Sequence, residues 1–103
     1  MAVISVDFEE AHRLLSENKN ILLFDVREEE EYITGHAFDA VLFTLADINE
    51  ESAAEMIPSR DTPVMVYCRS GARSAQAARI LSDLGYKTVY DLGGLIGWPY
   101  GLE

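Results

Sequence analysis

Cysteine is almost absent from this chain of 103 residues, in which Cys68 is the only one. A single cysteine cannot form an internal disulfide, a CxxC redox pair or a cysteine zinc cluster. No apolar run approaches the roughly 18 residues that a transmembrane helix needs, and the first residues lack the basic flank and apolar run of a signal peptide. These absences predict a soluble, cytoplasmic protein that does not enter a membrane.

Proline is also scarce, at 3 residues, and the chain has no internal repeat, low-complexity tract or Gly/Ser linker. Because a domain contains about 100 to 200 residues, the length predicts one domain that comprises residues 1–103. With 49% apolar and 25% charged residues, the composition is that of an ordinary globular protein. We interpret Leu102 and Glu103 as a candidate expression-tag junction and give them no weight.

Basic residues are few, at 8 Lys and Arg against 18 Asp and Glu, and the net charge is −10. Residues 1–60 hold 14 of the acids and 4 of the bases, so they carry all of the net charge. Such a chain repels phosphate backbones, so nucleic acid is not an expected partner. We interpret the acidic run at 28–31 as the solvated start of a helix, although the acidic half also suits a protein partner.

Short apolar runs alternate with helical patterns along the chain. Strands are expected at 21–26, 64–67, 87–90, 41–43 and 3–6, and the first two read as buried on both faces. Helices are expected at 8–15 after an Asp7 cap, at 28–33, at 49–57, and from a Ser74 cap to Leu84, with Gly85 as the C′ residue. This alternation predicts an α/β domain of three layers.

The segment 67–74, Tyr-Cys-Arg-Ser-Gly-Ala-Arg-Ser, carries the strongest chemical signal. A buried strand is expected to end at Cys68, at the edge of the sheet where α/β proteins place their sites. Gly71 permits a turn that aims consecutive N–H groups inward, and the helix start, Arg69 and Arg73 add positive charge. These features favour a thiolate, so we interpret Cys68 as a nucleophile rather than a buried, inert thiol.

The segment 68–74 resembles the active-site loop of single-domain rhodaneses, which are sulfurtransferases that carry a cysteine persulfide. Asp25-Val26-Arg27, Glu31-Tyr32 and Gly35-His36 resemble the amino-terminal signature of the family, and 90–94 with 98–99 resembles the carboxy-terminal one. The resemblance implies a rhodanese-like domain with a central five-stranded parallel sheet flanked by helices. It also implies transfer of sulfane sulfur through a Cys68 persulfide, from thiosulfate or a persulfide donor to a thiol or cyanide, with no metal and no cofactor.

Roles follow for the residues of the cysteine loop. Backbone N–H groups of 69–73 are expected to hold the terminal sulfur, much as an oxyanion hole does. The donor-binding residues are therefore Arg69, Ser70, Gly71, Ala72 and Arg73. Arg69 and Arg73 are candidates for contact with an anionic donor, and a pair between Arg73 and a core carboxylate is the alternative.

Four residues outside the loop receive supporting roles. We interpret Asp25 and Arg27 as an ion pair that braces the site, with substrate contact as the alternative. His36 is expected to bond loop backbone rather than act as a base for Cys68, and Ser74 to cap the helix. The segment 37–45 departs from the family, which reads Gly-Ala and then Asn-Ile-Pro there, so the sequence leaves this loop and one wall of the pocket undetermined.

Two rival functions remain open. A cysteine phosphatase or arsenate reductase uses the same strand, loop and helix but needs five residues between Cys and Arg, whereas Cys68 and Arg73 are separated by four. A non-catalytic rhodanese-fold binding or regulatory module typically lacks the cysteine that this chain retains. Thiosulfate, glutathione persulfide and a protein persulfide all remain open as donors.

Overall fold

Strands and helices alternate along the chain in the computed structural model, which describes residues 3–103. The elements are β1 (Val3–Ser5), α1 (Phe8–Glu17), β2 (Leu22–Asp25), α2 (Glu29–Ile33), β3 (Val41–Leu42), the 3₁₀ turn η1 (Leu45–Asp47), α3 (Glu50–Met56), β4 (Val64–Cys68), α4 (Ala72–Asp83) and β5 (Val89–Gly94). Every expected strand is present. The last strand begins later and ends later than the apolar pattern predicts, because it continues through two glycines.

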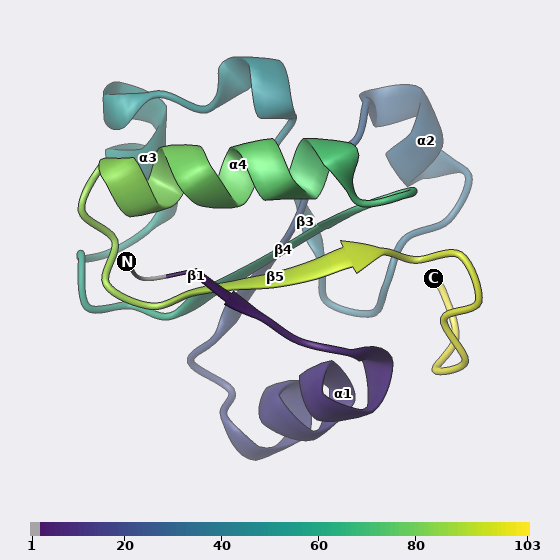
Figure 1. Cartoon of the computed structure of the whole chain (residues 1–103). Coiled ribbons are helices and arrows are strands. Elements are labelled where there is room, and N and C mark those ends of the chain that lie inside the picture. The colour runs from purple at the N-terminus through teal and green to yellow at the C-terminus, as the bar shows by residue number, and fades with distance from the viewer. Residues whose placement is uncertain (1–2) are drawn as a thin grey trace.

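The five strands form one parallel sheet in the order β1-β5-β4-β2-β3 (Figure 1). β4 lies in the middle, and all of its residues are buried. Parallel neighbours require crossover connections, which the helices supply. The predicted fold class, an α/β domain with a five-stranded parallel sheet flanked by helices, is confirmed.

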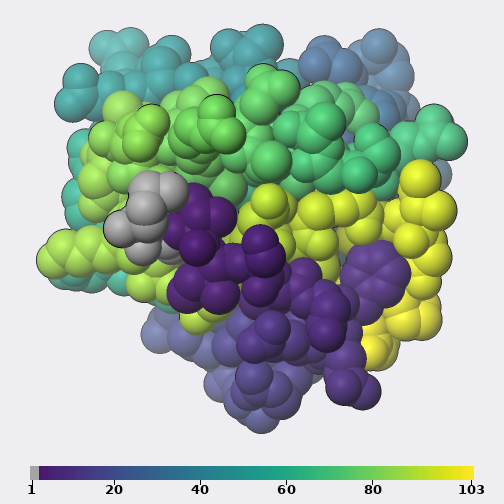
Figure 2. All heavy atoms as spheres, viewed as in Figure 1, coloured from purple at the N-terminus to yellow at the C-terminus, as the bar shows by residue number. Residues whose placement is uncertain are grey.

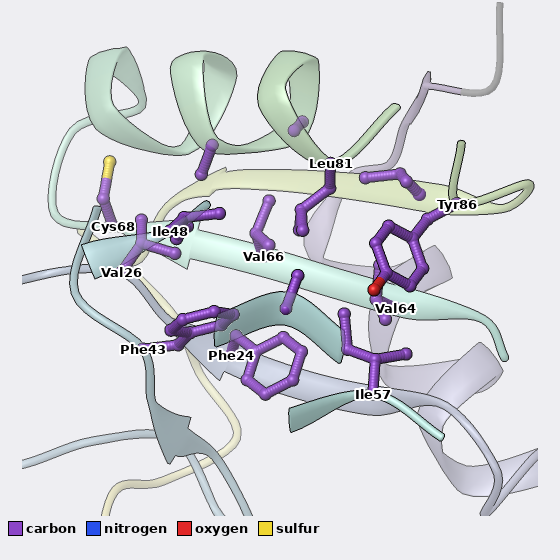
Figure 3. Packing of buried hydrophobic residues seen from close by; sticks show 14 residues of the cluster. Phe24, Val26, Phe43, Ile48, Ile57, Val64, Val66, Cys68, Leu81 and Tyr86 are labelled. Atoms are coloured by element: carbon purple, nitrogen blue, oxygen red, sulfur yellow. The ribbon is translucent and has the colours of Figure 1, made fainter. Parts of the chain in front are cut away.

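Helices α3 and α4 cover one face of the sheet and α1 covers the other (Figure 1). Because side chains alternate along a strand, β4 contributes to both cores. Val64 and Val66 face α4 and pack near Leu81 (Figure 3), whereas Met65 and Tyr67 belong to the core on the α1 face. No helix within residues 3–103 is long and apolar enough to cross a membrane.

The ends of the helices follow local signals in most places. The Asp7 carboxylate accepts the Glu10 N–H at 2.8 Å and caps α1, and Asn49 caps α3 in the same way. Gly85 follows α4 with φ +97°, as expected for a C′ glycine.

The start of α4 differs from the prediction. The helix begins at Ala72, and its N-cap is Gly71 rather than Ser74. Gly71 has φ +111°, a left-handed conformation that turns the chain directly from the loop into the helix. Ser74 lies inside the first turn, fully buried, and its hydroxyl donates to the Gly71 carbonyl at 3.0 Å. It therefore stabilises the turn from within the helix.

Gly94 positions the cysteine loop. It pairs with Cys68 after a register shift between β4 and β5, and the next N–H, that of Leu95, donates to the Cys68 carbonyl at 3.1 Å. A Cβ atom on Gly94 would lie 2.4 Å from the Arg69 carbonyl oxygen and 2.7 Å from the Ser70 Cα. Only glycine lets the loop pack directly on β5, so Gly94 is part of the site's scaffold.

We expect Gly94→Ala to lower the free energy of unfolding by about 3 kcal/mol, since the methyl group meets backbone that cannot move aside cheaply. Gly93→Ala is the matched control, because Gly93 has φ +82° but a Cβ atom placed there would meet no other atom within 4 Å. It should lose only about 1 kcal/mol for the left-handed conformation. Urea denaturation measures both, and equal losses in the two variants would contradict the packing argument.

Candidate active site

Cys68 ends β4, with 1% of its surface exposed, and its sulfur points toward the first turn of α4 (Figure 3). The Gly71 N–H donates to its Sγ atom at 2.9 Å. N–H groups of a first helical turn have no intrahelical acceptor, and the helix start carries partial positive charge. The loop therefore places one backbone N–H donor and the start of a helix next to the sulfur.

Arg73 does not point a free guanidinium at the sulfur. Its Nη1 and Nη2 atoms donate to the two carboxylate oxygens of Glu31 at 2.7 and 3.0 Å. The alternative interpretation of Arg73, a pair with a carboxylate, is thus the arrangement present. The carboxylate comes from α2 and is 30% exposed, so it is not a core group. Arg73 holds α2 against the start of α4.

This pair shifts the pKa values of both partners. The hydrogen bonds from Arg73, helped by the Glu28 N–H, lower the pKa of Glu31 from 4.5 to about 2. The same carboxylate raises the pKa of Arg73. Both side chains therefore stay charged through the whole range in which the protein is expected to work.

Arg69 and Ser70 are exposed at the tip of the loop, and Ala72 is exposed at the helix start. Within residues 3–103, Arg69 makes no salt bridge. It follows Cys68 directly in the chain. Arg69 is therefore the guanidinium of the cysteine loop that is available to an incoming anion.

Asp25 is completely buried and is satisfied by several donors. The Arg27 backbone N–H, Nε and Nη2 donate to it at 2.9, 2.9 and 2.7 Å, and the Tyr67 hydroxyl donates at 2.7 Å. Arg27 Nη2 also donates to the Gly35 carbonyl at 2.7 Å. The Ala37 N–H donates to the Tyr67 oxygen at 3.1 Å. The structure thus contains the Asp25–Arg27 pair that the sequence suggests, within a larger network.

Sequence reasoning missed Tyr67, which joins this network from the residue next to Cys68. The available signal was its position, since a tyrosine in a fully buried strand needs a partner for its hydroxyl. Burial, followed by the hydrogen bond to Asp25, raises the pKa of Tyr67, and hydrogen bonding to Asp25 raises the pKa of Arg27. Both groups keep their protons near neutral pH, and their hydrogen bonds bridge β2, β4 and the loop at 35–37.

His36 bonds to backbone, and it makes no hydrogen bond to the Cys68 sulfur in the described residues. Its Nδ1 atom is 2.9 Å from the Tyr32 carbonyl oxygen, and its ring stacks on that of Tyr32 at 3.8 Å between centroids. Its Nε2 atom is 3.6 Å from the Glu103 carboxylate. In the described part of the chain, no three His, Cys, Asp or Glu side chains are grouped to hold a metal ion.

The atypical segment 37–45 shapes the side of the molecule near α1. Phe38 is 54% exposed, Asp39 has φ +67°, and both line a hollow beside α1 with Lys19. The hollow at the strand ends next to Arg69 is lined from this region by Gly35 instead. None of residues 37–45 lines that hollow, whereas Ala37, Phe38 and Asp39 line the one beside α1.

We expect Glu31→Gln to remove a pH-dependent part of the stability. A carboxylate with a lowered folded pKa stabilises the fold above its unfolded pKa, near 4.5, and loses this contribution as pH falls toward about 2. The difference in unfolding free energy between wild type and Glu31→Gln should be full at pH 7 and vanish near pH 2. Glu30→Gln, a neighbouring exposed residue of α2, is the control; the same profile there would contradict the assignment.

Comparison with known proteins places these features in a family. The family model described as "Rhodanese-like domain" matches residues 7–99. The thiosulfate sulfurtransferase PspE of Escherichia coli is 39% identical over 71 residues, which cover 69% of this chain and 67% of that protein. A tRNA uridine(34) hydroxylase of Chlamydia trachomatis is 39% identical over 102 residues, which cover 92% of this chain but only 30% of that protein.

A solved structure shares the fold. The structure described as a rhodanese with anions from Escherichia coli superimposes with a TM-score of 0.73 at 34% identity, covering 81% of this chain and 96% of that one. Residues 7–99, which the family model matches, include the carboxyl ends of β2 and β4 and the cysteine loop. This chain therefore belongs to the rhodanese-like domain family, whose members include sulfurtransferases.

Proposed function

We propose that this chain is a sulfurtransferase of the thiosulfate sulfurtransferase type, in which Cys68 carries the sulfur as a persulfide. The observation that supports this most directly is the Gly71 N–H at 2.9 Å from the Sγ atom, inside a loop that opens a helix. Family membership alone does not specify the reaction, because the related hydroxylase contains a matching region. The buried, N–H-bonded cysteine is what favours sulfur chemistry here.

The proposed reaction has two balanced steps. The Cys68 thiolate attacks the outer sulfur of thiosulfate, the sulfur–sulfur bond of the donor breaks, and sulfite leaves with the electron pair. Cys68 is then a persulfide. In the second step a thiolate or cyanide attacks the terminal sulfur, and the electron pair of the breaking bond returns to Cys68 Sγ. The products are an acceptor persulfide or thiocyanate and the starting thiolate, without a cofactor.

The backbone and the side chains of the cysteine loop have different proposed roles. N–H groups of residues 69–73 hold the terminal sulfur and its negative charge, and Ser70, Gly71 and Ala72 contribute through their backbone. Arg69 attracts an anionic donor such as thiosulfate. Arg73 contributes by holding the loop through Glu31. A protein persulfide is an alternative donor, and the cytoplasm is the proposed location.

We expect Cys68→Ser to abolish sulfur transfer while the fold is retained, because serine is nearly the same size. Intact mass spectrometry after exposure to thiosulfate should show one added sulfur atom on wild-type protein and none on the variant. Circular dichroism checks the fold of both. Addition of sulfur to Cys68→Ser at the wild-type yield would contradict the proposal.

We expect Arg69→Ala to raise the KM for thiosulfate about fivefold, the effect of one exposed charge pair. The difference from wild type should shrink at high salt, because screening weakens exposed charges most. Turnover with a neutral thiol acceptor such as 2-mercaptoethanol should change less. Arg79→Ala removes an exposed arginine of α4 and is the matched control. Equal losses in both half-reactions would mean that Arg69 shapes the loop instead.

A further inference from the structure

A hollow of about 320 Å³ opens at the edge of the sheet that ends with β3. It is lined by Leu42, Phe43 and Thr44, by Asp47 of η1, and by Glu55 and Met56 of α3. Leu42 and Phe43 are consecutive residues of an extended segment, so their side chains point to opposite faces of the sheet. Because both residues line the hollow, it lies along the edge itself and not on one face. None of its lining residues has a role in the proposed reaction.

The backbone at this edge has groups that the sheet does not use. The N–H groups of Phe43 and Leu45 donate to the Asp25 and Val26 carbonyls of the neighbouring strand at 2.9 and 3.1 Å. Successive N–H groups of an extended chain point to opposite edges, so the N–H of Thr44 faces away from β2. It has no backbone acceptor among residues 3–103. An edge with such groups is a template for a further strand.

Negative charge is concentrated beside this edge. Residues 28–59 contain nine acidic residues and no Lys or Arg, so the rest of the chain is nearly neutral. In Figure 2 the helices of this segment, α2 and α3, are the blue and teal atoms at the top, on the side away from α1. Asp47 and Glu55, which line the hollow, are exposed. Neither makes a salt bridge within residues 3–103.

The inner wall of the hollow is apolar. The ring of Phe43 packs on Phe24 at 5.2 Å between centroids (Figure 3), and Met56 is partly buried against the same core. Methionine adapts its shape to different partners. The volume is close to the lower limit of about 300 Å³ for sites that hold a whole small molecule. It therefore suits one apolar side chain of a larger partner.

Charge decides between the possible partners. Pairing of this edge with the same edge of a second copy would bring two acidic segments together, and like charges that face each other are destabilising. A basic partner has the complementary charge. Extended peptides that add to a sheet edge gain affinity from backbone hydrogen bonds and specificity from alternate side chains.

We propose that this edge binds an extended, basic segment of a partner protein, which adds to the sheet beside β3. The partner places an apolar side chain in the hollow and Lys or Arg side chains against Asp47 and Glu55. This interaction surface goes beyond the proposed sulfurtransferase function and does not depend on it, since no sulfur chemistry is involved.

Thr44 allows the backbone contact to be tested. Its φ of −55° and ψ of 135° suit proline, so Thr44→Pro removes the outward N–H and keeps the fold. Thr44→Val is the matched control, because it retains the N–H. The probe is the fluorescein-labelled peptide Lys-Val-Arg-Ile-Lys-Val with an amidated end. Fluorescence anisotropy should show about fivefold weaker binding to Thr44→Pro than to Thr44→Val. Equal affinity of the two variants would overturn strand addition.

A second probe makes the same test on the wild-type chain. It has the same side chains and charge, but all of its backbone amides are N-methylated, so it cannot pair as a strand. It should bind about tenfold more weakly than the first peptide, because several backbone hydrogen bonds are lost. If both probes bind equally, or if the first does not bind, the proposal is wrong. Self-association of the protein through this edge, measured by analytical ultracentrifugation, would also overturn it.

The charge contribution is tested at the rim of the hollow. Asp47→Asn and Glu55→Gln preserve side-chain shape, and each should weaken peptide binding about threefold, with a smaller effect at high salt. Glu9→Gln is the matched control, since Glu9 is an exposed acid of α1 on the other side of the sheet. Equal losses in all three variants would mean that the peptide senses only the net charge, and the assignment of the hollow would fall. Failure of sulfur uptake by Cys68 would leave each of these results unchanged.

Discussion

A carboxylate that is completely buried between two parallel strands organises the edge of the sheet where the chemistry is placed. Asp25 is fully buried, so its charge must be met by internal donors, and removing one of them would leave a costly unpaired charge. Arg27 and Tyr67 meet it, and each has a second partner in the loop at 35–37. One desolvated charge thereby fixes β2, β4 and a loop relative to one another.

Two glycines then let the reactive loop close on this frame. Gly71 takes a left-handed conformation that aims its N–H at the Cys68 sulfur. Gly94 removes the side chain that would collide with the loop backbone. The first glycine supplies a conformation and the second supplies space. The loop can take this conformation only because both conditions hold at once.

Charge is used differently in the two halves of the protein. Residues 1–60 carry the whole excess of acid, yet one of those acids, Glu31, neutralises Arg73 and holds α2 at the site. Arg69 and Arg73, the two candidates for contact with an anionic donor, therefore have different environments. Arg73 is paired with Glu31, whereas Arg69 makes no salt bridge to any residue of 3–103.

The sequence by itself determined the alternation of strands and helices, the cap at Asp7, the stop at Gly85, and the place of Cys68 at a strand end. These depend on periodicity and on groups a few residues apart, and most of the fold could be predicted from them and the family resemblance. Only the tertiary structure decided that Arg73 meets Glu31 and that Tyr67 meets Asp25, each pair separated by 42 residues. Such contacts depend on strand register and helix placement, which no short segment encodes. The same holds for the space that Gly94 leaves, since its neighbours come from another strand and loop.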